Sequence, residues 1–409
     1  MTHVTTIRSL PTRTLAGLAT LSAAAFVAVT TETLPTGLLP QISAGFHVDQ
    51  AKAGSLVAVY ALVVAVGSIP LAIMTNRFPR KALILCTLAG YVVSSLMVVS
   101  THSFRVAVLA RVIGGTAHAL FFAVGSAYAT RLVPPHLVGK SIAALQTGGS
   151  LALIAGTPLG TAIGLATGWR SAFLVLAAAA LVLMVAAARL LPPVASSEPV
   201  SWSEALNGLR APGLGIIAVV SAVAFAAHYS AFTYIAPLLR RGGIGQSHVA
   251  LVLLLFGVGG MVGVWLSGIA ADRLPHRSMI ASFVVLPAAM VLLWLSAGFP
   301  GGTVVGSVAW STAFVATPTL ITTAALRAGR SHPDMAAAMV NSTCNIGISA
   351  GAIGGGFALN HAGLAGVTLL SATVFTGALV LVLMAAHAFR LPLKGAPLPA
   401  GRVAALVHD

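Results

Sequence analysis

"AIMTNRFPRK" (residues 72–81) and "GIAADRLPHR" (residues 268–277) are two versions of one segment, 196 residues apart. At this offset Asn76 aligns with Asp272, and both are followed by an arginine, a proline and a basic residue at matching positions. Similarity that recurs at a fixed spacing indicates an internal repeat. The two segments therefore divide the chain into halves that we expect to fold alike.

Apolar residues dominate the whole chain. Hydrophobic residues make up 58% of the 409 residues, and charged residues only 7%. A soluble domain carries about 25% charged residues, so the composition excludes a solvated globular protein. The apolar runs are continuous rather than alternating, which favours membrane-spanning helices over a β-barrel.

Runs of about 20 apolar residues are long enough to cross the hydrocarbon core of a bilayer. The chain has twelve such runs, separated by short polar turns. They cover residues 14–40, 53–75, 82–100, 106–130, 140–165, 171–191, 213–238, 247–271, 279–298, 302–325, 335–359 and 364–388. We therefore predict an all-α polytopic membrane protein whose twelve transmembrane helices form two pseudo-symmetric six-helix bundles.

A longer polar segment between the sixth and seventh runs sets the predicted domain boundaries. We expect the N-terminal bundle at residues 1–191, a cytoplasmic linker at 192–212, and the C-terminal bundle with a short basic cytoplasmic tail at 213–409.

The first apolar run begins like a signal peptide, but it continues for about 26 residues, longer than the apolar region of such a peptide. We expect it to be retained as the first helix.

The formal charge of +15 raises the question of nucleic-acid binding. With the N-terminus inside, however, 16 of the 22 lysines and arginines fall on the inner side of the predicted helices. This asymmetry is the positive-inside pattern, which predicts that both termini are cytoplasmic. The basic charge thus reflects the topology of the chain in the cytoplasmic membrane, and we expect no nucleic-acid partner. We also expect the chain to be monomeric in the lipid bilayer.

The two cysteines, Cys86 and Cys344, both fall within predicted spans. Two isolated thiols at membrane depth indicate neither a disulfide framework nor a metal cluster. We therefore expect no metal and no cofactor.

The fifth predicted helix of each half carries small residues at every fourth position, with an offset of 199 residues between the halves. The positions are Gly148, Ala152, Gly156, Gly160 and Gly164 in the first half and Gly347, Gly351 and Gly355 in the second. A stripe of small residues allows close helix packing in a membrane. Two such faces would also suit halves that rock against each other, as in transporters with repeated halves.

Glu32 is one of only seven acidic residues, and it lies inside the first predicted span. A charged residue at the centre of a membrane helix costs about 2.5–3.5 kcal/mol on insertion scales, so it is expected to face a cavity, pair with a cation or bind a proton. Burial and a nearby cation act in opposite directions on the protonation of a carboxylate. We therefore predict that Glu32 takes up and releases a proton.

Arg111, in the fourth predicted span, lies at a depth similar to that of Glu32. Gly115 and His118 follow it at helical spacing on the same face. Three interpretations are open: a structural ion pair with Glu32, a role in proton coupling or substrate binding, and snorkelling of Arg111 to the outer surface.

The offset of 196 residues carries Glu32 onto His228, so each half has one ionisable residue at the same place in its first helix. Phe225, Tyr229 and Phe232 lie on or beside the His228 face, where aromatic residues either pack or line a cavity. A midplane cavity is expected between the halves. Its predicted substrate-binding residues are Glu32, Thr36, Tyr60, His118, Gln146, His228, Tyr229, Phe232, Asn341 and Asn345.

Asp272 is the acidic residue of a basic inner loop. A salt bridge from this carboxylate could latch one conformation, whereas the arginines around it, and Arg77 and Arg80 in the first half, are expected to set orientation.

The motifs together resemble those of the major facilitator superfamily, and within it the twelve-helix drug:proton antiporters, over essentially the whole chain. The family's inner-loop motif, Gly-x-Leu-Ala-Asp-Arg-x-Gly-Arg-Lys, is similar to residues 268–277 and, with Ala72, Asn76 and Pro79 as departures, to residues 72–81. The arginine of its fourth helix matches Arg111. The resemblance implies a conformational role for Asn76, Arg77, Arg80, Gly156, Pro158, Gly160, Asp272, Arg273 and Arg277.

Other segments narrow the resemblance. "GTPLGTAIG" (156–164) is similar to the antiporter motif of the fifth helix, with Thr157 inserted between Gly156 and Pro158. "TTETLPTGLLPQI" (30–42) and "HYSAFTYIAPLL" (228–239) look most like the branch of arabinose-type sugar efflux carriers and chloramphenicol-type exporters.

The resemblance implies a secondary active transporter that exports a small amphiphilic molecule, such as a chloramphenicol-like antibiotic, with H⁺ as the coupling ion at Glu32 and Arg111. The alternatives are a sugar or metabolite exporter, a proton-coupled importer and a non-transporting membrane receptor. An enzyme is not expected, because the ionisable residues at membrane depth include no obvious nucleophile and no third metal ligand beside the two histidines.

Overall fold

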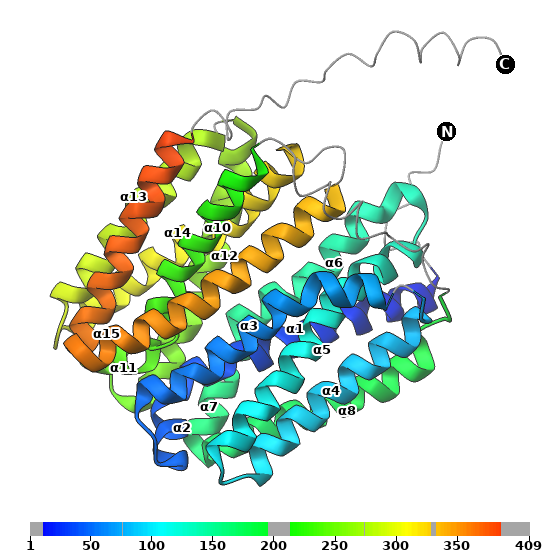
Figure 1. Ribbon diagram of the computed structural model, residues 1–409, viewed down its shortest axis with the longest axis horizontal. Coiled ribbons are helices and arrows are strands. Elements are labelled where there is room, and N and C mark those ends of the chain that lie inside the picture. The colour runs from blue at the N-terminus through cyan, green and yellow to red at the C-terminus, as the bar shows by residue number, and fades with distance from the viewer. Residues whose placement is uncertain (1–10, 76, 195–212, 274, 329–332, 386–409) are drawn as a thin grey trace, which may run out of the picture.

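The computed structural model describes residues 11–75, 77–194, 213–273, 275–328 and 333–385. Within these ranges every regular element is a helix, and the helices form two bundles that lie side by side (Figure 1). The prediction of an all-α protein with a six-helix bundle in each half is confirmed. The predicted linker at 192–212 lies almost wholly outside the described residues.

The N-terminal bundle contains six spans. Its elements are α1 (Thr12–Gly37), α2 (Leu39–Phe46), α3 (Gln50–Met74), α4 (Arg80–Ser100), α5 (Phe104–Arg131), η2 (Pro135–Leu137), α6 (Val138–Leu151), η3 (Ala152–Gly156), α7 (Thr157–Thr167) and α8 (Trp169–Leu190). The fifth span, Val138–Thr167, is continuous through α6, η3 and α7. Its centre, η3, is a π-helical turn that ends two residues before Pro158. A proline cannot donate the next helical hydrogen bond, so a local change of winding is expected there.

The C-terminal bundle repeats this arrangement. Its elements are α10 (Leu214–Phe232), α11 (Ile235–Arg241), η4 (Gln246–His248), α12 (Val249–Arg273), α13 (Pro275–Leu295), α14 (Pro300–Ala328) and α15 (Pro333–Met384). The apolar part of α15, Ala338–Met384, has 47 residues, which at 1.5 Å per residue is about 70 Å, twice what one crossing needs. The backbone leaves the helical conformation at Gly363 (φ 62°), where only glycine is unstrained, and the chain turns back (Figure 1).

The described residues contain eleven helical stretches long and apolar enough to cross a membrane. The last of them counts twice because of the turn at Gly363, which gives the twelve crossings expected from the sequence. The chain is therefore a multi-pass membrane protein.

The first helix of each half is broken at the same place, which the sequence analysis did not predict. Leu38 (φ −114°, ψ 13°) separates α1 from α2, and Tyr234 (φ −108°, ψ 23°) separates α10 from α11. The two residues are 196 positions apart, so the repeat seen in the sequence extends to the backbone conformation.

The small-residue stripes pack against the first helix of their own half. A Cβ atom on Gly156 or Gly160 would collide with Thr30 or Leu34 of α1. In the second half, a Cβ atom on Gly351 would collide with the backbone of Ala226 in α10. The interpretation of the stripes as sliding faces between the halves is therefore wrong; they provide close packing within each half.

The halves meet through α3 against α15 and through η3 and α7 against α12, while α11 packs on α1 and α2. Asn341 of α15 donates a hydrogen bond across this interface to Ser68 of α3, at 3.2 Å. One apolar cluster runs from the α2 end of the N-terminal bundle into the C-terminal bundle, and a second cluster fills the remainder of the N-terminal bundle. The shared apolar packing of the halves thus lies at the end where α2 and α11 are found.

Candidate functional site at the interface of the two bundles

The site begins with a proline in α1. Pro35 has no N–H group, so the carbonyl of Thr31, four residues earlier, loses its helical partner. Inside a membrane such a carbonyl must be satisfied by another group. Arg111 of α5 supplies it: its Nη1 donates to the Thr31 carbonyl at 2.8 Å.

Arg111 holds three main-chain carbonyls at once. Besides Thr31, its Nη2 donates to the carbonyl of Glu32 at 3.1 Å, and its Nε donates to the carbonyl of Leu56 in α3 at 3.0 Å. The guanidinium group also lies over the ring of Tyr60, 4.0 Å from its centroid, a favourable contact for a cation. Only 1% of Arg111 is exposed, so the side chain fastens α1, α3 and α5 together and does not snorkel to the surface.

The carboxylate of Glu32 faces a histidine rather than the arginine. Its Oε2 lies 3.8 Å from Nε2 of His118, which is the ion-pair contact found for this carboxylate among the described residues. The first of the three interpretations of Arg111, a side-chain ion pair with Glu32, is wrong, because the guanidinium is already bound to backbone oxygens. Both Glu32 and His118 are buried.

Tyr60 completes this polar group. Its hydroxyl lies 3.1 Å from Nδ1 of His118, and the His118 ring packs against Phe122, with ring centroids 4.8 Å apart. Glu32, His118 and Tyr60 therefore form a buried chain of three titratable side chains from α1, α5 and α3, which we call the Glu32 group.

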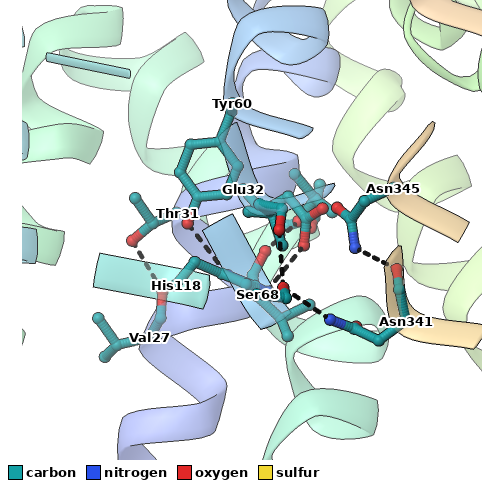
Figure 2. A network of polar contacts seen from close by, with 12 residues as sticks. Val27, Thr31, Glu32, Tyr60, Ser68, His118, Asn341 and Asn345 are labelled. Atoms are coloured by element: carbon teal, nitrogen blue, oxygen red, sulfur yellow. Dashed lines mark hydrogen bonds and ion pairs between the residues drawn. The ribbon is translucent and has the colours of Figure 1, made fainter. Parts of the chain in front are cut away.

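The Glu32 group is directed towards the other half of the molecule. Figure 2 shows Glu32 between His118 on one side and the α15 residue Asn345 on the other. The carboxylate thus lies where the two bundles meet.

Asn341 and Asn345 form the polar edge of α15 at this interface. Asn341 donates to Ser68, and Nδ2 of Asn345 donates to the Asn341 carbonyl at 3.0 Å (Figure 2). The Oδ1 atom of Asn345 is buried and has no hydrogen-bond partner in the protein. A buried amide oxygen of this kind is an acceptor available to a ligand.

The counterpart of the Glu32 group in the C-terminal bundle is aromatic. His228 of α10 stacks on Phe314 of α14, with parallel rings 3.6 Å apart, and on Phe232 at 4.9 Å. Its Nδ1 accepts a hydrogen bond from Nε1 of Trp310 at 3.0 Å. Because Nδ1 is an acceptor there, the buried imidazole is the neutral form with its proton on Nε2.

The other residues predicted for substrate binding are placed as follows. Tyr229 and Phe232 are buried on α10 and contact the His228 ring, at 5.1 and 4.9 Å between centroids. Thr36 is buried, but its hydroxyl is bonded to the Thr33 carbonyl of its own helix. Gln146 is exposed on α6. Glu32, Tyr60 and His118 are brought together, whereas Thr36 and Gln146 do not join them.

The predicted conformational residues with basic side chains lie at or near the ends of helices. Arg77 is exposed and lies over the ring of Phe78. Arg80 is the first residue of α4 rather than part of an open loop, and it is buried; its backbone N–H donates to the Val194 carbonyl at 3.2 Å. Arg277 is exposed near the start of α13.

Three of the predicted conformational residues lie wholly or partly outside the described part of the chain. Asn76 lies outside the described residues, as do the side chains of Asp272 and Arg273. The backbone of Asp272 and Arg273 belongs to the last turn of α12, not to a loop.

Thr157, the residue inserted in the fifth-helix motif, contacts the segment that carries Glu32. Its hydroxyl lies 2.6 Å from that of Thr33, and Gly156 and Pro158 on either side of it are buried. Sequence reasoning did not assign this contact, nor the roles of Ser68, Trp310 and Phe314. The repeat could have found Phe314, because adding 196 to the candidate residue His118 gives this position.

Among the described residues, no group of three or more His, Cys, Asp or Glu side chains is arranged to hold a metal ion. The site is instead one buried carboxylate with its histidine and tyrosine, an amide edge across the interface, and an aromatic cluster. Twelve spans in two repeated bundles with such a site between them define a membrane transporter of the repeated-bundle class.

Comparison with known proteins gives the family. The sequence profile of the Major Facilitator Superfamily matches residues 21–352, and the chain therefore belongs to this superfamily of membrane transporters. Solved transporter structures share the fold. A bacterial homologue of the human lysosomal transporter Spinster, inward-facing and unoccupied, has a TM-score of 0.69 at 17% identity, covering 93% of this chain and 97% of its own.

Two further structures are similar. The human organic anion transporter MFSD10 (TETRAN) has a TM-score of 0.68 at 14% identity, covering 91% of this chain and 100% of its own. The transporter FucP in its outward conformation has a TM-score of 0.63 at 16% identity, covering 91% and 99%. At these identities the similarity extends to the fold alone.

Proposed function

We propose that this chain exports a small amphiphilic molecule across a bacterial cytoplasmic membrane in exchange for protons, by alternating access between its two bundles. The observation that carries the proposal is the position of Glu32. A buried carboxylate that faces the other bundle, with a histidine beside it and no side-chain ion pair to the nearby arginine, is able to gain and lose a proton as its surroundings change.

The chemistry of the opposite wall supports an amphiphilic substrate. The C-terminal bundle presents aromatic rings around His228, and α15 presents the amides of Asn341 and Asn345. A molecule with a flat apolar part and a few polar groups would use both surfaces, as small-molecule sites usually do. A chloramphenicol-like antibiotic has this character.

In the proposed cycle, Glu32 takes up a proton while the site is open to the outside and releases it after the site has opened inward. One proton that crosses 100 mV supplies about 2.3 kcal/mol, enough for roughly a fifty-fold substrate gradient. The proposal includes cytoplasmic termini and a cytoplasmic linker, on the positive-inside pattern of the loops. It requires neither a cofactor nor a second copy of the chain.

The test is substrate-evoked proton flux in proteoliposomes that contain the purified transporter and a pH-sensitive dye. Chloramphenicol should evoke proton movement in the wild type and in Glu32→Asp, which keeps a carboxylate, and should evoke none in Glu32→Gln. Equal flux in Glu32→Gln and wild type would remove Glu32 from the coupling mechanism and defeat the proposal.

A second candidate is export of a sugar or metabolite, and it is favoured by the amide edge of α15. The unpartnered Oδ1 of Asn345 is an acceptor for a sugar hydroxyl. Running the same flux assay with arabinose in place of chloramphenicol separates the two. Flux with arabinose alone, lost in Asn345→Leu, would favour the sugar exporter.

A further inference from the structure

We infer that Glu32 and His118 bind the coupling proton together, as one shared site whose geometry is set by Tyr60, and that Arg111 is a structural clamp rather than the partner of the carboxylate. This inference rests on the proposed function and names its proton-binding residues. It differs from the interpretation of Arg111 as the ion-pair partner of Glu32.

The geometry of the pair places the two side chains within reach of one proton. Nε2 of His118 lies 3.8 Å from Oε2 of Glu32, about 1 Å beyond a hydrogen bond. A small side-chain rotation, or a bridging water, connects the two atoms. The histidine is held from behind by the Tyr60 hydroxyl and by the Phe122 ring, so its Nε2 edge stays directed at the carboxylate.

Arg111 acts on the pair through its charge and keeps its hydrogen bonds to the backbone. Its three donors are bound to main-chain carbonyls of Thr31, Glu32 and Leu56. Releasing the guanidinium to the Glu32 carboxylate would leave the Thr31 carbonyl, which Pro35 has already deprived of its helical donor, without a hydrogen bond inside the membrane. Arg111 therefore contributes a fixed positive charge near the pair and does not exchange with the proton.

Other titratable groups also lie near the carboxylate. Tyr60 and Tyr91 face it from α3 and α4, Arg111 and His118 from α5, Tyr229 from α10 and Cys344 from α15. His118 is the member of this set at ion-pair distance from the carboxylate.

The pair takes up and releases one proton. With Nδ1–H of His118 donating to the Tyr60 oxygen, the Nε2 lone pair faces Glu32. A proton arriving from the interface forms the carboxylic acid of Glu32, and its O–H group donates to this lone pair, so the two side chains hold the proton between them. Breaking the same O–H bond releases the proton and restores the carboxylate, and no other reactant is needed.

The equivalent position in the C-terminal bundle has aromatic and imidazole rings in place of the carboxylate and histidine. His228 and Phe314 are the counterparts of Glu32 and His118 at the offset of 196. They form a parallel ring stack at 3.6 Å. An ionisable pair is thus present in one half only, and the C-terminal bundle contributes aromatic surface at the equivalent position.

The experiment is a pH titration of the purified transporter in lipid nanodiscs, followed by infrared difference spectroscopy with isotope-labelled glutamate. The chain has three glutamates, of which Glu198 and Glu204 lie in the polar segment between the halves, so Glu32→Gln identifies the band of the buried carboxyl group. No substrate is needed, and the measurement is therefore independent of transport.

His118→Gln should change the proton affinity of the Glu32 carboxyl group by at least about tenfold, one pH unit. Tyr60→Phe keeps the ring beneath Arg111 but removes the hydroxyl from Nδ1, and it should give a smaller change in the same direction; it also provides a second reading if His118→Gln folds poorly. His361→Gln removes an exposed histidine and should leave the titration unchanged.

A Glu32 band that titrates identically in the wild type, His118→Gln and Tyr60→Phe would overturn the shared site. If proton flux is still lost in Glu32→Gln, Glu32 binds the coupling proton without His118, and the proposed function stands. If instead the Glu32 titration depends on His118 but no substrate evokes proton flux, the shared proton site stands and the proposed export function is refuted.

Discussion

Arg111 binds Glu32 through its main-chain carbonyl, at 3.1 Å, and not through its carboxylate. The reason lies three residues further along α1, where Pro35 removes a helical donor and leaves the Thr31 carbonyl without its helical partner. Arg111, which the sequence suggests as a counter-ion for Glu32, thus instead donates a hydrogen bond to the carbonyl that Pro35 leaves without a helical donor. The carboxylate is left to His118, 3.8 Å away.

Arg111→Lys should destabilise the transporter although the positive charge is kept. A lysine ammonium is a compact donor without the planar fork of arginine, and it cannot reach three carbonyls on two helices at once. Each lost hydrogen bond to a charged group contributes about 1.5–3 kcal/mol. Thermal unfolding in a fixed detergent should therefore show a clearly lower midpoint. Arg105→Lys, at an exposed position near the start of the same helix, is the control, and equal midpoints for the two variants would contradict the clamp.

Pro35→Ala should relieve part of the damage caused by Arg111→Lys. The new N–H group at position 35 can donate to the Thr31 carbonyl, so this oxygen depends less on the arginine. A double-mutant cycle should give a coupling energy of about 0.5–3 kcal/mol between the two positions, in the range for residues that share a partner. Strictly additive unfolding free energies would mean that Pro35 does not create the need for Arg111.

Thr157→Val should cost about 1 kcal/mol of unfolding free energy, because it removes the buried hydroxyl contact with Thr33 at 2.6 Å while the shape of the side chain is kept. Thr33 retains its bond to the Val29 carbonyl, which limits the loss. Thr147→Val is the matched control on the same span: Thr147 is exposed and bonds only its own helix, at Ala143. A larger effect at position 147 than at 157 would contradict the assigned contact.

The spans were predictable from sequence because hydropathy is a local property. Each of the twelve predicted runs corresponds to a helical crossing. The breaks at Leu38 and Tyr234 were not predicted, since both lie within continuous apolar sequence. Their equal backbone conformation depends on how α2 and α11 pack where the halves meet, which a hydropathy pattern does not contain.

The alignment of the two small-residue stripes with each other could not be predicted correctly from the sequence. The sequence comparison pairs the stripes at an offset of 199, but in the structure Gly156 opposes Thr30 and Gly351 opposes Ala226. Thr30 and Ala226 are 196 residues apart, so the structural partner of Gly156 is Gly351, one helical turn before the residue given by the sequence. A pattern that repeats every four residues looks the same after a shift of four, and only packing against α1 and α10 fixes it.

The site was predicted in part. Ionisable residues in apolar runs are easily seen, and Glu32, Arg111, His118 and His228 were all found in this way. Their partners were not, because the sequence does not show that the guanidinium meets backbone oxygens or that the carboxylate turns towards His118. Pro35 was the signal available: it stands in the same segment as Glu32, and a proline inside a span implies a free carbonyl four residues earlier.

Gly351→Ala should be the more damaging of two chemically identical changes in α15. A Cβ atom at position 351 collides with the backbone of Ala226, which cannot move aside like a flexible side chain, so an overpacking cost of about 1–3 kcal/mol is expected. At Gly377 the same Cβ atom meets open space, and alanine should stabilise the helix there by about 0.5–1 kcal/mol through lower backbone entropy in the unfolded chain. Thermal unfolding of both variants, in one detergent and at one lipid content, compares them directly. Equal stability of the two variants would mean that α10 and α15 are not in the close contact that the glycine stripe permits.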